Sequence, residues 1–208
     1  MMIRTAKTLF LLIKHKRVLL PLINSYAFFL ENKQDTIWGS LSGIDREEVE
    51  RLVREAAEHG GPIIEIGTLF GFTTQLMAAC KRPGQKLITI DNFSWNPFAL
   101  STADHREFTR RSLHYCLKHS DVTLFEGTSE LFFKDYDGMP PALIFIDAAH
   151  DYESVKHDIE LASGSAPNVL SGHDYTEISP GVVKAVNETL GKVSVRGCVW
   201  SSSPRFAS

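Results

Sequence analysis

Acidic and glycine residues recur in this sequence where short apolar runs end. Five runs end this way, at Glu65 and Gly67, at Asp91, at Glu126 and Gly127, at Asp147, and at Gly172 to Asp174. Carboxylates accept hydrogen bonds from the hydroxyl groups of ligands and bind cations, and glycine lets a ligand approach the backbone closely. The recurrence indicates one binding site built by several segments.

The spacing of these runs predicts the elements that position the site. A run such as LIFI at 143–146 is typical of a strand buried on both faces, which occurs mainly in parallel sheets. We expect strands at 62–67, 86–91, 122–127, 142–147 and 168–174, a β-rich tail at 192–203, and helices at 45–61, 72–80, 102–118, 152–162 and 180–190. This alternation predicts an α/β fold with a doubly wound, mostly parallel sheet, which binds ligands at the carboxyl ends of its strands.

Two helix starts carry recognisable caps. Asp45 precedes an amphipathic segment and Glu48 follows three residues later, which predicts a capping box with Asp45 as N-cap. At the helix expected from Tyr152, His150 and Asp151 are better placed to cap than Asp147. Capping therefore leaves Asp147 available for another role.

Length and composition limit the classes of protein to which this chain can belong. The chain has 208 residues, enough for one substantial core, and we expect a helical extension at 1–44 followed by one domain at 45–208. The net charge of -3 provides no dominant basic field, which argues against a nucleic-acid partner. Three widely spaced cysteines argue against a disulfide framework and favour a reducing, cytoplasmic location.

The N-terminal extension holds the most apolar stretch, residues 8–30. Basic residues at 14–17 and Pro21 interrupt it, so no transmembrane span is expected. The run LFLLI is too short for a secretory signal. Four roles remain open for this basic segment: a cap on the core, a lid over an active site, a homodimer contact, and weak contact with a membrane surface.

The segment EIGTLFGFTT at 65–74 is expected to form a glycine turn between a strand and a helix. Gly67 would let a ligand approach, and the helix would offer free amide groups. The GxGxxG motif of dinucleotide sites is missing, because position 69 is leucine. Asp91, 24 residues beyond Gly67, can accept hydrogen bonds from both hydroxyls of a ribose. The glycine turn and Asp91 together predict a nucleoside site. Glu65 has no packing role in a buried strand, which favours a contact with the ligand.

These motifs resemble those of class I S-adenosylmethionine-dependent methyltransferases over roughly residues 45–190. The segments IDAAHDYESVKHDI and SGHDY are similar to the branch that includes macrolide-sugar O-methyltransferases and cephalosporin-hydroxylase-like proteins. The resemblance implies a Rossmann-like fold with a seven-stranded sheet and methyl transfer to a small-molecule hydroxyl.

The resemblance also implies the residues that bind S-adenosylmethionine. They are Glu65 and Gly67 near the methionine end, Asp91 on the ribose, Thr128 and Ser129 near the adenine, and in addition Gly71, Thr73 and Asp147.

A divalent cation is a further implication of the resemblance, with Asp147 and Asp174 as ligands, and the neighbouring His173 is a third candidate ligand. Asp147 and His150 would be the catalytic residues, and His150 would act as the general base. Mg²⁺ prefers oxygen ligands. Related metal-dependent proteins place an acid or amide beside Asp174, whereas His173 here favours softer ions such as Mn²⁺, Fe²⁺ or Zn²⁺. Whether a metal is required stays open.

Two other functions compete with methyl transfer. A nicotinamide-dependent oxidoreductase could use a similar sheet, but GxGxxG and a Tyr-x-x-x-Lys pair are both missing. A non-catalytic Rossmann-like binding protein is the other alternative. The aromatic loop at 92–100 is expected to form either a small satellite core or a wall of the binding site.

Overall fold

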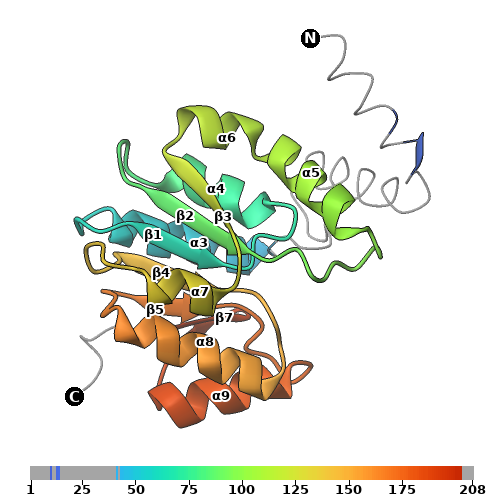
Figure 1. Cartoon of the computed structure of the whole chain (residues 1–208). Helices are drawn as coiled ribbons and strands as arrows, with labels where there is room; N and C mark the ends of the chain where they lie inside the picture. Colours follow the sequence, from blue (N-terminus) through green and yellow to red (C-terminus); the bar gives the residue numbers. More distant parts are fainter. Residues whose placement is uncertain (1–9, 11–12, 15–40, 42, 203–208) are drawn as a thin grey trace.

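The computed structural model describes residues 10, 13–14, 41 and 43–202 of the chain. Within this part, seven strands form one sheet in the order β3-β2-β1-β4-β5-β7-β6 (Figure 1). The strands are β1 Ile63–Ile66, β2 Leu87–Asp91, β3 Val122–Glu126, β4 Leu143–Ile146, β5 Leu170–Gly172, β6 Ser194–Arg196 and β7 Val199–Ser202. Strands β1 to β5 are parallel, and β7 is antiparallel to both β5 and β6. The predicted seven-stranded, mostly parallel sheet is confirmed.

Helices cover both faces of this sheet. They are α3 Gly43–Ala56, α4 Phe72–Cys80, α5 Thr102–Ser112, α6 His114–His119, α7 Ser129–Lys134, α8 Tyr152–Gly164 and α9 Pro180–Leu190. Side chains alternate along a strand. Ile63 therefore packs in the core under α3, α4 and α6, whereas Ile64 packs in the core under α7, α8 and α9. The sheet is doubly wound.

The order of the strands predicts a ligand crevice beside β1. The chain runs outward from β1 through β2 to β3 and then returns to β4 on the other side of β1. Ligands bind at such a reversal, at the carboxyl ends of the strands. Here Asp147 follows β4, and its amide donates to the carbonyl of Ile66 at 2.8 Å. The predicted glycine turn and Asp147 therefore meet at this crevice.

The prediction that Asp45 is an N-cap is wrong. Helix α3 begins at Gly43, so Asp45 lies in its first turn. Its carboxylate instead accepts a hydrogen bond from the Cys198 amide at 2.6 Å, in the turn between β6 and β7. The carboxylate of Glu48 binds Arg51 and Arg196 rather than the helix start. Both carboxylates thus bind groups in distant parts of the chain instead of forming the local hydrogen bonds of a capping box.

Other helix boundaries differ in smaller ways. The helix expected at 102–118 is divided at Leu113, whose side chain packs against Gly71 at the start of α4. Helix α7 was not predicted. Asp151 caps α8 by accepting from the Ser154 amide at 3.0 Å, which confirms the expectation for that helix start.

The tail forms the β6–β7 hairpin at one edge of the sheet. No helix among the described residues is long and apolar enough to span a membrane. The roles considered for residues 1–44 fall almost entirely outside the residues that the structure describes.

Gly67 should be required for the approach of β4 to β1. Its φ is +98°, and a Cβ there would lie 2.0 Å from the Asp147 carbonyl oxygen. Gly84 has a φ of +76° but open space around it, so it is a matched control. We expect Gly84→Ala to cost about 1–2 kcal/mol for the left-handed backbone. Gly67→Ala should cost about 2 kcal/mol more, because of the clash. Urea unfolding measures both, and equal losses would contradict the packing role.

Candidate active site

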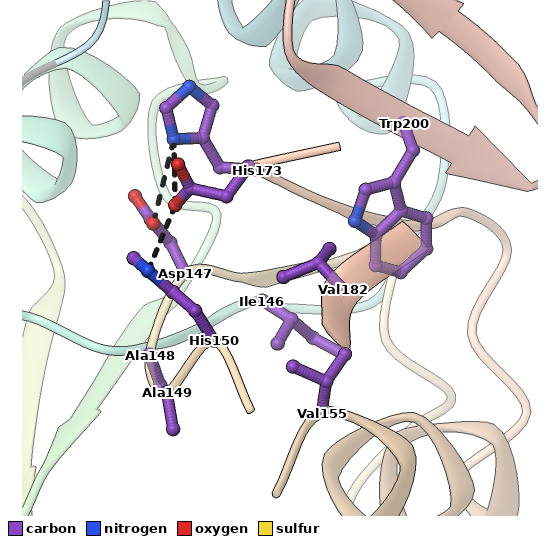
Figure 2. Close-up of a pocket in the computed structure, with 10 residues that line it drawn as sticks. Ile146, Asp147, Ala148, Ala149, His150, Val155, His173, Val182 and Trp200 are labelled. Carbon is purple, nitrogen blue, oxygen red and sulfur yellow. Dashed lines mark ion pairs between the residues drawn. The ribbon is translucent and has the colours of Figure 1, made fainter. Parts of the chain in front are cut away.

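A pocket opens at the carboxyl ends of β4 and β5 (Figure 2). One side is polar and consists of Asp147, His150, His173 and Asp174, which follow these two strands. The other side is apolar and consists of Ile146, Val155, Val182 and Trp200, from β4, α8, α9 and β7. The sheet order therefore joins, in one pocket, residues that are widely separated in the sequence.

The four polar residues form a connected network of imidazoles and carboxylates. Nε2 of His150 lies 2.9 Å from Oδ2 of Asp174. Nδ1 of His173 lies 3.4 Å from the same Asp174 oxygen and 3.7 Å from Oδ1 of Asp147 (Figure 2). The structure thus brings together all four residues for which catalytic or metal-binding roles were predicted, while the roles themselves stay predictions.

These contacts change the protonation of both histidines. Burial alone would lower the pKa of His173, but Asp147 and Asp174 outweigh it and raise this pKa to about 11. Burial alone would raise the pKa of Asp174, but His150 and His173 hold it well below its usual value. The hydrogen bond with Asp174 raises the pKa of His150. The network therefore favours charged imidazolium and carboxylate groups.

Three of these side chains lie close enough together to hold a cation. Asp147, His173 and Asp174 each offer one ligand atom, and these atoms lie within 4.8 Å of one another. Two carboxylate oxygens with one imidazole nitrogen form a mixed donor set. Such a set fits Mn²⁺, Fe²⁺ or Zn²⁺ better than Mg²⁺, which prefers oxygen alone.

Glu65 is fully buried beneath the glycine turn. The hydroxyl of Thr74 in α4 donates to its Oε2, whereas Oε1 has no hydrogen-bond partner among the described residues. Burial raises the pKa of Glu65 to about 8, despite hydrogen bonds from Thr74 and Thr89 that lower it. An unpartnered buried carboxylate oxygen is costly unless a cation or a donor satisfies it, so Glu65 has the character of a ligand-binding group.

Asp91 supports the glycine turn. Its Oδ2 accepts hydrogen bonds from the amides of Thr68 and Leu69 at 3.0 and 2.7 Å, and its Oδ1 accepts one from the Phe93 amide at 2.7 Å. Leu69 has a left-handed backbone with φ of +46°. The predicted ribose contact remains a prediction, and the structure adds a second role, since this carboxylate fixes the turn.

The remaining predicted cofactor residues make contacts within the protein. Gly71 begins α4 with φ of +81°, and Thr73 is buried in the same helix. Thr128 caps α7 by accepting from the Leu131 amide at 3.2 Å. The hydroxyl of Ser129 donates to Asp158 in α8. These contacts explain the four residues structurally, and their cofactor roles stay predictions.

Two rings of the aromatic loop at 92–100 pack inside the protein, while its other expected role, as a wall of the binding site, stays a prediction. Phe98 packs against Phe70 and belongs to a satellite core, and Phe93 is buried with its ring against His105. Trp95 is 68% exposed.

Two residues of the site were missed from the sequence. Oδ2 of Asp45 lies 3.3 Å from Nε2 of His173, across 128 positions of the sequence. Trp200 is 1% exposed and lines the pocket, and its indole nitrogen has no partner in the part of the chain that is described. The sequence presents Asp45 only as a helix cap and Trp200 in no motif, so only the fold reveals their contacts with the site.

Comparisons with known proteins agree with this architecture. A family model described as a methyltransferase domain matches residues 64–175, more than half of the chain. In a sequence search, no curated protein matches the chain.

Several solved structures have a similar fold. The calicheamicin methyltransferase CalS11 is 17% identical with a TM-score of 0.63, and the match covers 79% of each chain. An O-methyltransferase from Bacillus cereus in complex with SAH is 15% identical with a TM-score of 0.62, over 88% of this chain and 90% of that one. The O-methyltransferase TomG from Streptomyces achromogenes, in complex with SAM, is 16% identical with a TM-score of 0.58, over 79% and 81%. At these identities, the likeness concerns the fold.

The buried Glu65 should make stability depend on pH. Its pKa is about 8 in the folded protein against 4.5 ordinarily, so folding favours its protonated form. This contribution is complete below pH 4.5 and is lost as the pH rises to about 8, at up to about 1.4 kcal/mol per pH unit. We therefore expect the unfolding free energy of the wild type, relative to that of Glu65→Gln, to fall between these pH values and to level off above them.

Urea unfolding across this pH range measures the effect. Glu48→Gln is a matched control, because Glu48 is also buried but its pKa is lowered by Arg51. Its stabilising contribution is present above the ordinary pKa and is lost only as the pH falls. Parallel curves for the wild type and Glu65→Gln would show that the Glu65 carboxyl has no raised pKa.

Proposed function

Because the chain belongs to the methyltransferase-domain family and is a class I S-adenosylmethionine-dependent methyltransferase, we propose that it methylates a hydroxyl oxygen of a small molecule. The observation that carries this proposal is the polar side of the pocket, where half-exposed His150 contacts the carboxylate of Asp174 beside Asp147. A side chain of this kind can act as the base that removes the proton from a hydroxyl. CalS11, named as a TDP-rhamnose 3'-O-methyltransferase, and TomG also act in O-methylation according to their names.

Glu65 supports the assignment of the cofactor. When bound, S-adenosylmethionine supplies a methyl group on a positively charged sulfur, and its methionine end carries an ammonium group. The unpartnered Oε1 of Glu65 lies beneath the glycine turn and fits a cationic donor. Such a donor would satisfy the oxygen and stabilise the charged carboxylate in its buried position. Glu65 and Gly67 would then hold the methionine end, and Asp91 the ribose.

His150 is the proposed general base. Its Nε2 lies 2.9 Å from Asp174, and half of its side chain is exposed, so the ring can reach an acceptor that enters from solvent. When the ring is neutral, it accepts the proton that leaves the acceptor hydroxyl. Asp174 stabilises the imidazolium that forms and keeps the ring in place. Asp147, at the crevice beside β1, orients the acceptor toward the methyl group.

A divalent cation is the proposed second cofactor, held by Asp147, His173 and Asp174. This donor set favours Mn²⁺, Fe²⁺ or Zn²⁺ over Mg²⁺. When bound, the cation would promote ionisation of the acceptor hydroxyl. A cytoplasmic location and a homodimer remain predictions from the sequence.

Methyl transfer can be tested directly. With S-adenosylmethionine carrying a labelled methyl group and a panel of hydroxylated acceptors, such as nucleotide sugars and phenols, we expect label in an O-methyl product. Calorimetry should detect binding of S-adenosylmethionine and no binding of NAD. A chelator should reduce transfer, and Mn²⁺ should restore it. Transfer that a chelator leaves unchanged would contradict the cation, and failure to bind S-adenosylmethionine would contradict the whole proposal.

Substitution of His150 should impair chemistry without impairing cofactor binding. We expect His150→Gln to lower kcat about 10²- to 10⁴-fold, the usual contribution of a general base. The affinity for S-adenosylmethionine should change less than twofold. His157→Gln is the matched control, because His157 is an exposed histidine of the neighbouring helix α8. Equal kcat values for the two variants would exclude His150 as the base.

A further inference from the structure

We propose that Asp45 is a positioning residue of the active site, because its carboxylate fixes which nitrogen of His173 faces the pocket. The inference rests on the proposed function, since His173 belongs to the site proposed for the cation. Asp45 lies outside the pocket itself and acts through the histidine ring.

The two nitrogens of His173 have separate partners. Nε2 lies 3.3 Å from Oδ2 of Asp45 in α3. Nδ1 lies 3.4 Å from Asp174 and 3.7 Å from Asp147. The ring thus bridges helix α3 and the pocket. A flip of the ring would exchange these contacts.

Asp45 is held firmly enough to set this orientation. Its side chain is 4% exposed, and its Oδ1 accepts a hydrogen bond from the Cys198 amide at 2.6 Å. The hairpin turn leaves room for this carboxylate only because residue 197 is glycine, since a Cβ there would lie 2.1 Å from Oδ1. Helix α3 is itself anchored in the core by fully buried Val49 and Val53.

The chemistry of imidazole explains why such a partner matters. A ring that binds a cation through one nitrogen keeps its proton on the other, and a carboxylate that accepts this proton fixes both the tautomer and the ring orientation. With Nε2–H directed at Asp45, Nδ1 beside Asp147 and Asp174 is the nitrogen that can give up its proton and bind a cation. The structure therefore contains a carboxylate–histidine pair behind the proposed cation site.

The contact with Cys198 also gives Asp45 a structural role, so the test needs a property that stability alone does not change. Asp45→Asn keeps the shape and an oxygen for the Cys198 amide, but it presents an NH₂ group to Nε2 of His173. This group would require the ring proton to leave Nε2. Glu48→Gln is the matched control, because Glu48 is an equally buried acid of the same helix that contacts Arg51 and Arg196 instead.

Nitrogen-resolved NMR of the histidine rings decides the proposal in the protein without added metal. We expect a protected, downfield Nε2–H signal of His173 in the wild type and in Glu48→Gln, assigned by its loss in His173→Gln. The signal should be absent from Asp45→Asn. The proposal is overturned if Asp45→Asn retains the Nε2–H signal or if the wild type lacks it. The second outcome can be observed even if the variant fails to fold.

Calorimetric titration with MnCl₂ then measures the consequence for the site. We expect Asp45→Asn to bind Mn²⁺ about 10- to 100-fold more weakly than the wild type, with less than a twofold change in affinity for S-adenosylmethionine. Glu48→Gln should match the wild type in both. If the wild type binds no Mn²⁺, the cation of the proposed function fails while the ring signals still test Asp45. Wild-type Mn²⁺ affinity in Asp45→Asn would overturn the positioning role.

Discussion

The close approach of β4 to β1 is the constraint on which the site depends. Gly67 has no side chain, so the backbone of Asp147 can lie directly against it. This contact aligns the carboxyl ends of the two strands at the point where the strand order reverses. As a result, the glycine turn on one side and the acidic pocket on the other open at the same edge of the sheet.

Burial of charge is the second organising feature. Asp45, Asp147 and Asp174 converge on His173, whose imidazolium offsets part of their negative charge. Removing charged groups from water costs several kcal/mol per ion, and well-packed apolar residues would often be at least as stable. A network of this kind is therefore poorly explained by stability alone. Glu65 makes the same point, because one of its buried oxygens lacks a protein partner in the part of the chain described.

The glycine turn combines structural and binding roles in the same residues. Asp91 accepts amide hydrogen bonds from both Thr68 and Leu69, and it thereby holds Leu69 in a left-handed conformation that a leucine rarely adopts. The carbonyl of Leu69 is in turn bonded by His105 and Thr109 of α5. The turn is thus fixed from both sides before any ligand arrives. Such preorganisation reduces the cost of ordering a binding loop.

Some features follow from the sequence alone because their causes are local. Apolar runs such as LIFI at 143–146 and amphipathic segments such as 180–190 determine the strands and helices, and their alternation determines a doubly wound parallel sheet. That fold places the carboxyl ends of the parallel strands at one edge, so Asp147, His173 and Asp174 could be expected to lie together.

Other features were decided only by the tertiary structure. Asp45 looks like an N-cap in the sequence. In the folded protein, its carboxylate instead contacts the amide of Cys198, 153 residues away, and the ring of His173. Trp200 reaches the pocket only because the hairpin pairs with β5. Asp91 binds amides of a turn more than 20 residues before it. Local patterns fix which segments become helices or strands, whereas the partner of a buried polar group depends on which distant groups the fold brings within hydrogen-bonding distance.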